Sequence, residues 1–88
     1  MSALSSLKNI GKEMEHKLTS IGIATAEELI NLGSKEAFIK LKTAYPNICL
    51  VHLYTLEGAI SNIEYNQLNE DTKQQLRKIN NSLKNNGL

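Results

Sequence analysis

The chain is poor in the residues that build cross-linked, metal-bound or membrane-spanning proteins. It has one cysteine, Cys49, two histidines and no tryptophan. A lone cysteine cannot form a disulfide within the chain, so a reducing compartment, the cytoplasm, is the expected location. No run of about 18 apolar residues is present, so no membrane association is expected. The first residues also lack the basic start and apolar core of a secretory signal peptide.

Excess charge of one sign is lacking as well. Lys and Arg number 10 and Asp and Glu number 9, which gives a net charge of +1. A dedicated nucleic-acid-binding domain is more basic, so contact with DNA would depend on a local patch and would be weak and salt-sensitive. The composition, 41% hydrophobic and 22% charged, is that of a folded domain. We expect residues 1–88 to form a single domain.

What the chain does have is apolar residues at helical spacing, and no stretch alternates as a strand would. This predicts an all-α fold, a compact bundle of five to six short helices. The expected helices are a short first one that ends near Lys8, followed by ranges 12–20, 25–33, 34–44, 48–61 and 69–85. Range 48–61 is apolar around most of its circumference, as in a central, buried helix. The last helix has one apolar stripe and is expected to fray at Asn85-Asn86-Gly87.

Residues that favour helix ends stand at the expected boundaries. Thr25 and Glu28 have the spacing of a capping box. Gly58 interrupts an otherwise apolar helix at a cost of about 0.8–1 kcal/mol, which indicates that another backbone approaches closely there. The remaining expected end residues are the N-caps Ser34, Asn47 and Asn69 and the left-handed Gly22 and Asn62.

The stretch from Leu7 to Lys12 resembles a helix-hairpin-helix turn. Gly11 tolerates backbone dihedrals that other residues resist, and amides at the start of the next helix could hold a phosphate. Lys8 and Lys12 bracket the turn and Lys17 follows, although Glu13 and Glu15 would repel a polyanion. The candidate nucleic-acid-binding residues are Lys8, Asn9, Ile10, Gly11, Lys12 and Lys17.

The same pattern occurs twice. Leu7-x-Asn9-Ile10-Gly11 is repeated as Leu29-x-Asn31-Leu32-Gly33. If each copy joins a helix to a helix, the fold contains one or two helix-hairpin-helix-like units. The repeat also favours an architectural role for the turn.

The titratable residues predict no catalytic or metal site. Cys49 and His52 could supply two ligands from one helix, but no second pair completes a tetrahedral zinc site. We therefore expect Cys49 to be a small buried hydrophobe. Glu57, within the apolar helix, is expected to make a structural hydrogen bond or ion pair, for example to a helix N-terminus. We expect no enzyme activity and no cofactor, unless Glu57, His52 and Cys49 line one deep polar pocket.

Taken together, these motifs resemble the C-terminal domain of the TfoX/Sxy family, bacterial regulators of natural competence. The resemblance covers about residues 7–76, and its most specific part is the segment after the Pro-Asn turn. The residues that carry it are Asn9-Ile10-Gly11, Leu18, Gly22-Ile23-x-Thr25, Glu28-Leu29, Leu32-Gly33, Tyr45-Pro46-Asn47 and Leu53-Tyr54-x-Leu56-Glu57-Gly58-Ala59-Ile60.

The resemblance implies a helix-hairpin-helix-like, non-enzymatic domain with a role in competence gene regulation. It would act by weak DNA binding, by docking on a transcription regulator protein, or both. The alternative is a pure protein-protein interaction module, supported by an exposed apolar patch on the last helix or around Ile63–Tyr65. Members of the family often carry an N-terminal α/β domain as well, so this sequence is either a stand-alone protein or one domain of a longer one.

Overall fold

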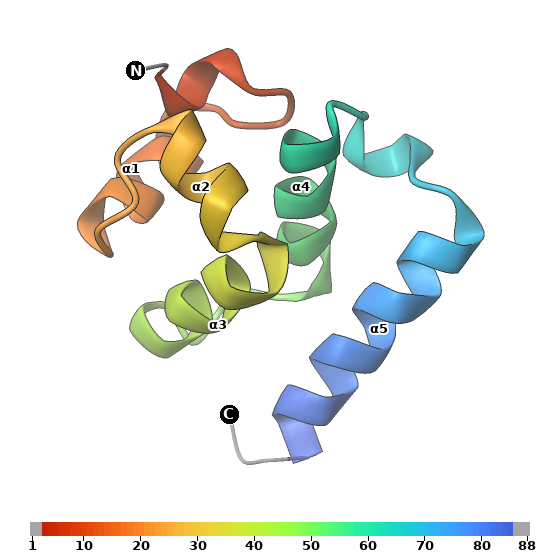
Figure 1. Cartoon of the computed structure of the whole chain (residues 1–88). Helices are drawn as coiled ribbons and strands as arrows, with labels where there is room; N and C mark the ends of the chain where they lie inside the picture. Colours follow the sequence, from red (N-terminus) through yellow and green to blue (C-terminus); the bar gives the residue numbers. More distant parts are fainter. Residues whose placement is uncertain (1–2, 86–88) are drawn as a thin grey trace.

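In the computed structural model, which describes residues 3–85, helices account for nearly all regular structure (Figure 1). The elements in chain order are η1 (Leu4–Ser6), α1 (Lys12–Ser20), α2 (Ala26–Leu32), α3 (Ser34–Ala44), α4 (Leu50–Ser61), η2 (Tyr65–Gln67) and α5 (Glu70–Asn85), where η marks a 3₁₀ turn. The only β pairing among these residues is an isolated bridge between Ala3 and Thr25. The all-α prediction is confirmed.

Helix α4 lies at the centre, and α3, η2 and α5 pack against it (Figure 1). Its inner side chains Leu53 and Leu56 are fully buried, as expected for the apolar range 48–61. Burial of each such side chain stabilises the fold by about 1.5–3 kcal/mol. The largest fully buried side chains are Phe38, Leu4, Leu18, Leu29, Leu41, Ile48, Leu53 and Leu56.

The ends of four helices form through the residues that the sequence indicates. The Thr25 hydroxyl accepts a hydrogen bond from the Glu28 amide at 3.2 Å, and the Glu28 carboxylate accepts one from the Ala24 amide at 3.1 Å. Asn69 caps α5 by accepting from the amide of Thr72 at 2.8 Å. Gly22 has φ +95° after α1, and Asn62 has φ +61° after α4.

Three expected boundaries differ from the structure. The first helix is a 3₁₀ turn that ends at Ser6 rather than near Lys8. The N-cap of α3 is Gly33, because the Ser34 hydroxyl bonds Glu57 instead of a backbone amide. Of the residues predicted to fray, Asn85 is the last residue of α5, and Asn86 and Gly87 lie outside the described part of the chain.

The third boundary is the start of α4, which is Leu50 rather than Ile48, with Cys49 as N-cap in place of Asn47. The Lys42 ammonium donates to the carbonyls of Ile48, at 2.7 Å, and Pro46, at 3.4 Å. This holds the segment as a turn for two further residues. As a result Ile48 is buried in the core, whereas Cys49 is exposed and is not the buried hydrophobe that we expected.

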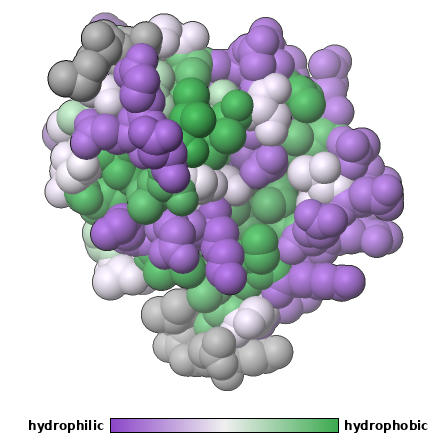
Figure 2. Space-filling view, in the orientation of Figure 1, coloured by the Kyte–Doolittle hydropathy of each residue, from purple (hydrophilic) through white to green (hydrophobic). Residues whose placement is uncertain are grey.

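The surface shown in Figure 2 mixes polar and apolar residues, and apolar surface is visible between separate groups of hydrophilic side chains. Most large apolar side chains of α5 face the core, since Leu76 and Leu83 are buried. The exposed ones lie elsewhere, at Ile30, Val51, Ile63 and Tyr65. Ile63 and Tyr65 are thus partly exposed, with the charged Glu64 between them, and the apolar stripe of α5 packs inside the molecule.

Candidate functional site

The turn from Leu7 to Lys12 uses its residues differently from the prediction. Asn9 has the left-handed conformation, with φ +71°, whereas Gly11 is extended, with φ −94° and ψ −176°. The expectation that Gly11 supplies the unusual dihedrals is therefore wrong. Gly11 is instead the N-cap of α1, and its carbonyl accepts from the amide of Glu15 at 2.9 Å.

The side chain of Asn9 points into the molecule. Its Nδ2 donates to the carbonyls of Ile63, at 3.1 Å, and Thr55, at 3.4 Å, and its Oδ1 accepts from the amide of Tyr65 at 3.2 Å. Through these hydrogen bonds Asn9 links the turn from Leu7 to Lys12 to the end of α4 and the segment after it. Its neighbour Ile10 is 6% exposed and belongs to the core. These two candidate residues hold the turn in place.

Two of the three candidate lysines are paired with carboxylates. The Lys8 ammonium pairs with Glu64 at 3.8 Å and that of Lys17 with Glu13 at 3.1 Å. Lys12 is exposed and makes no ion pair within residues 3–85. Two of the three positive charges are therefore offset by neighbouring carboxylates.

The two copies of the Asn-apolar-Gly pattern are not equivalent in structure. In the first copy Asn9 lies in a loop with positive φ and Gly11 begins a helix. In the second, Asn31 lies within α2, and Gly33, with φ +91°, separates α2 from α3. The pattern thus marks a helix boundary twice, through two different backbone geometries.

Two adjoining grooves lie along α1 and meet at Lys17 and His52. One, of about 270 Å³, runs from the start of α1 to α4, and the other, of about 260 Å³, runs to the turn between α3 and α4. We call the pair the α1–α4 cleft. The first groove is lined by Asn9, Gly11, Glu13, Met14, Lys17, His52 and Thr55, and the second by Lys17, Ala44, Tyr45, Pro46, Asn47, Ile48 and His52.

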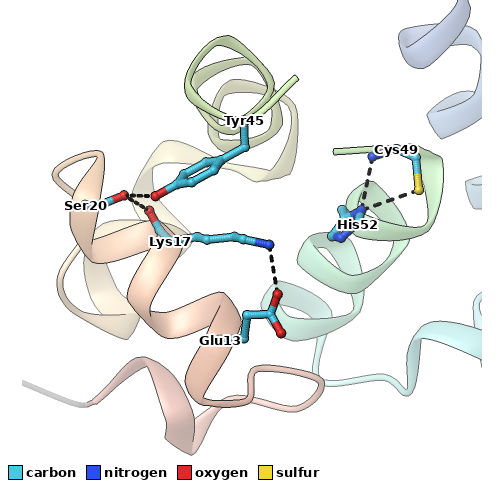
Figure 3. A network of polar contacts seen from close by, with 6 residues as sticks. All are labelled: Glu13, Lys17, Ser20, Tyr45, Cys49 and His52. Atoms are coloured by element: carbon cyan, nitrogen blue, oxygen red, sulfur yellow. Dashed lines mark hydrogen bonds and ion pairs between the residues drawn. The ribbon is translucent and has the colours of Figure 1, made fainter. Parts of the chain in front are cut away.

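Lys17 occupies the middle of this cleft (Figure 3). Its ammonium lies 5.6 Å from the centre of the Tyr45 ring, a cation–π distance. The Ser20 hydroxyl donates to the Lys17 carbonyl at 2.6 Å, so its contact with the Tyr45 hydroxyl, at 2.7 Å, has tyrosine as the donor. This bond fixes the ring that covers the ammonium. The Lys17 side chain is 24% exposed, whereas that of its partner Glu13 is 86% exposed.

His52 faces Lys17 across the cleft and closes the first turn of α4 (Figure 3). Its Nδ1 accepts a hydrogen bond from the Cys49 amide at 3.1 Å and lies 3.5 Å from the Cys49 sulfur. Partial burial lowers the pKa of His52, and the positive charge of Lys17 lowers it further, while Glu13 acts in the opposite direction. The imidazole is therefore neutral at neutral pH.

These side chains do not form a catalytic arrangement. The Glu57 carboxylate accepts from the hydroxyls of Ser34, at 2.7 Å, and Ser61, at 2.9 Å, as predicted for a structural bond at a helix N-terminus. Cys49 and His52 contact each other, and the grooves that they line do not include Glu57. Within residues 3–85 no three His, Cys, Asp or Glu side chains are grouped so that they could bind a metal.

Comparison with known protein families shows to which family the chain belongs. The family model described as the TfoX C-terminal domain matches residues 1–79. The chain belongs to the TfoX C-terminal domain family. This confirms the resemblance drawn from the sequence motifs, and it places the chain among regulatory domains. No curated protein matches the chain.

Two solved structures share the fold of this TfoX C-terminal domain. One is the triclinic form of an uncharacterized protein from Listeria monocytogenes, with 42% identity, a TM-score of 0.91 and coverage of 94% of each chain. The other is the tetragonal form of a protein of unknown function from Listeria monocytogenes, with 44% identity and a TM-score of 0.87. It covers 91% of this chain and 98% of that one.

Sequence reasoning placed the TfoX C-terminal domain's candidate residues at the first turn and missed the cleft beside it. The sequence predicts Lys17 only as a phosphate contact and His52 only as an incomplete metal ligand, and it predicts no ligand contact for Tyr45 or Ser20. A sequence signal for Tyr45 exists, since it precedes Pro46 and so must leave the helix. Nothing local indicates that its ring then covers a lysine on α1.

No helix in the described range has the length and apolar character needed to cross a membrane.

Proposed function

We propose that this TfoX C-terminal domain is a non-enzymatic regulatory domain of the bacterial cytoplasm that acts by docking on a transcription regulator protein, in competence gene regulation. Family membership supports the regulatory class. The choice of protein docking over DNA binding depends on the charges around the turn from Leu7 to Lys12.

The observation that carries this choice is the pairing of the candidate lysines. A DNA-binding hairpin presents free cations beside exposed helix amides, because phosphate contacts supply most of the affinity. Here Lys8 is paired with Glu64 and Lys17 with Glu13. Glu13 and Glu15 also lie in the first turn of α1, where a phosphate would have to sit. The positive face is broken, and a protein surface tolerates such mixed charge.

Weak DNA binding remains the second function because the start of α1 is open. An added Cβ on Gly11 would meet no atom within 4 Å, and Lys12 beside it is exposed. With about three phosphate contacts, a rise from about 50 to about 200 mM salt would lower the binding constant roughly 40-fold. Such binding would be measurable only at low salt.

Fluorescence anisotropy with a labelled DNA duplex separates the two functions. We expect no saturable binding at low salt, and no difference between the native chain and Lys8→Glu/Lys12→Glu. The matched control is Lys35→Glu/Lys40→Glu, which makes the same change of charge on α3. Saturable binding that only the first double variant abolishes would contradict the proposal and support the DNA-binding function.

Photo-crosslinking in cells tests docking directly. A photoreactive residue is placed, one at a time, at four exposed positions on different elements: Ile30, Asn47, Tyr65 and Asn81. Docking predicts that one or two positions cross-link the same transcription protein and that the others do not. Purified partner and native chain should then form a complex in solution. Cross-links to DNA alone would contradict the proposal.

A further inference from the structure

We propose that the α1–α4 cleft binds an acidic segment of the partner protein, and that a carboxylate of this segment replaces Glu13 at the ammonium of Lys17. The proposal rests on the proposed function, since it names the chemistry of the docked segment. To the proposed function it adds the binding site, the α1–α4 cleft, the charge recognised there, a carboxylate, and the group displaced, Glu13.

The first support is the position of Lys17. The side chain is only 24% exposed, the ammonium is covered by the Tyr45 ring at 5.6 Å, and the ring is fixed by its bond to Ser20. A cation that is already held in place loses little conformational freedom on binding. Because it is partly removed from water, it attracts a carboxylate more strongly than an exposed lysine does.

The second support is the weakness of the group that now pairs with Lys17. Glu13 lies one turn earlier on the same helix, and its side chain is 86% exposed. An ion pair between residues four apart on a helix contributes little to stability when its acid stays in water, so Glu13 can be exchanged at little cost. A carboxylate from a partner could reach the same ammonium along either groove, since Lys17 lines both.

The third support is the apolar wall beside the charge. The groove toward the α3–α4 turn is lined by Tyr45, Pro46 and Ile48 together with Lys17. An aliphatic side chain next to the incoming carboxylate can pack there. The cleft therefore fits a short acidic and apolar segment, with one carboxylate at the centre.

Other ligands fit the cleft less well. A basic segment would meet the Lys17 ammonium, and His52 offers it no negative charge. A nucleic acid carries a phosphate at every nucleotide, so several negative charges would approach Glu13, which lines the cleft, whereas the proposed segment brings one carboxylate. Another groove, of about 420 Å³, also carries one acid and one base, Glu28 and Lys40. There the Glu28 carboxylate is held by the Ala24 amide and the Thr25 hydroxyl, so it is less easily displaced than Glu13.

Nuclear magnetic resonance of the isotope-labelled chain tests the proposal with two blocked peptides. One has the order Ser-Leu-Glu-Leu-Ser and the other replaces Glu by Gln. The acidic peptide should shift the backbone signals of Lys17, Tyr45 and His52 in a saturable way. The amide peptide should bind roughly tenfold more weakly, the ratio that one charged hydrogen bond gives.

Two variants of the same ion pair should then have opposite effects. Lys17→Met keeps the side chain's length and should weaken binding of the acidic peptide roughly tenfold. Glu13→Gln removes the internal competitor and should tighten binding roughly two- to fivefold. The matched pair Lys8→Met and Glu64→Gln breaks the ion pair between the turn from Leu7 to Lys12 and the segment after α4, and it should leave binding unchanged. The spectrum of each variant also reports whether it is folded.

Equal binding of both peptides, weaker binding by Glu13→Gln, or shifts confined to other surfaces would overturn the proposal.

Failure of the cleft proposal can be distinguished from failure of the proposed function. If the peptides do not bind in the cleft while cross-links from another surface capture a transcription protein, docking stands and the cleft is not its site. If the chain binds DNA through the first turn, docking itself fails.

Discussion

The side-chain amide of Asn9 lies over the α-carbon of Gly58, in the space that a Cβ on residue 58 would need. The same space is bounded by the Ile63 carbonyl, which accepts a hydrogen bond from Asn9, and by the amide of Tyr65, 3.4 Å from that Cβ position. Gly58 is thus required by a close approach, as the sequence indicated. The group that approaches is part of the candidate binding turn, which gives that turn an architectural role.

We therefore expect Gly58→Ala to destabilise the domain although alanine favours helices. The gain in helix propensity is about 1 kcal/mol. The new methyl group must displace a backbone carbonyl as well as the Asn9 amide, and overpacking costs about 1–3 kcal/mol, occasionally more. Urea unfolding should show a net loss. Gly11→Ala is the control, because a Cβ there meets no atom within 4 Å, and it should lose only about 0.5–1 kcal/mol, the preference of an N-cap position for glycine over alanine.

Substitution of Asn9 should separate its hydrogen bonds from its backbone conformation. Asn9→Gly keeps φ at +71° free of strain but removes the bonds to Thr55, Ile63 and Tyr65, and it should cost about 1–3 kcal/mol. Asn9→Ala adds left-handed strain of about 1–2 kcal/mol. Thermal unfolding should thus rank native above Asn9→Gly above Asn9→Ala.

The second copy of the pattern provides the control for this ranking. Asn31 is exposed within α2, so Asn31→Ala should be neutral or slightly stabilising by helix propensity. Equal losses at positions 9 and 31 would contradict the inequivalence of the two copies.

The helices could be predicted from the sequence because their causes are local. The period of the apolar residues predicts each helix. Thr25 and Asn69 begin helices, and Asn62 ends one, through bonds or dihedrals within a few residues. The start of α4 could not be predicted in this way. There the Lys42 side chain holds the carbonyls of the preceding turn, and a lysine on a helix gives no sign of that use.

The role of Asn9 could not be predicted from the local sequence either, because its hydrogen-bond partners are 46 to 56 residues away along the chain. A local motif with a known use in DNA-binding turns was therefore assigned that use. The prediction for Glu57 succeeded for a general reason, since a carboxylate amid apolar residues must find donors wherever they are. The cleft depends on Tyr45 meeting Lys17, which only the packing of α3 against α1 determines.

The hydrogen bond between Ser34 and Glu57 should be the main polar link between α3 and α4. Ser34 is buried, and its hydroxyl donates to the carboxylate at 2.7 Å. Ser34→Ala should cost about 1.5–3 kcal/mol, the range for bonds to charged groups. Ser61→Ala removes the other, exposed hydroxyl that bonds Glu57 and should cost no more than about 0.5 kcal/mol. In a double-mutant cycle, Ser34→Ala and Glu57→Gln should be non-additive, and additive losses would show that the two side chains do not act together.

His52 should make stability depend on pH in a defined direction. Burial, and then the charge of Lys17, lower the pKa of His52 in the folded chain below the usual 6.5. As the pH falls below 6.5, the unfolded chain therefore binds more protons than the folded chain does. The resulting stabilisation is fully present above pH 6.5 and is lost as the pH falls through the lowered pKa of His52. Protonation of Nδ1 would also end its hydrogen bond from the Cys49 amide. Urea unfolding across this range should therefore show a decline with acidity that is smaller in His52→Gln, whose amide oxygen can still accept from Cys49. A decline in His52→Gln as steep as that of the native chain would exclude His52 as its source.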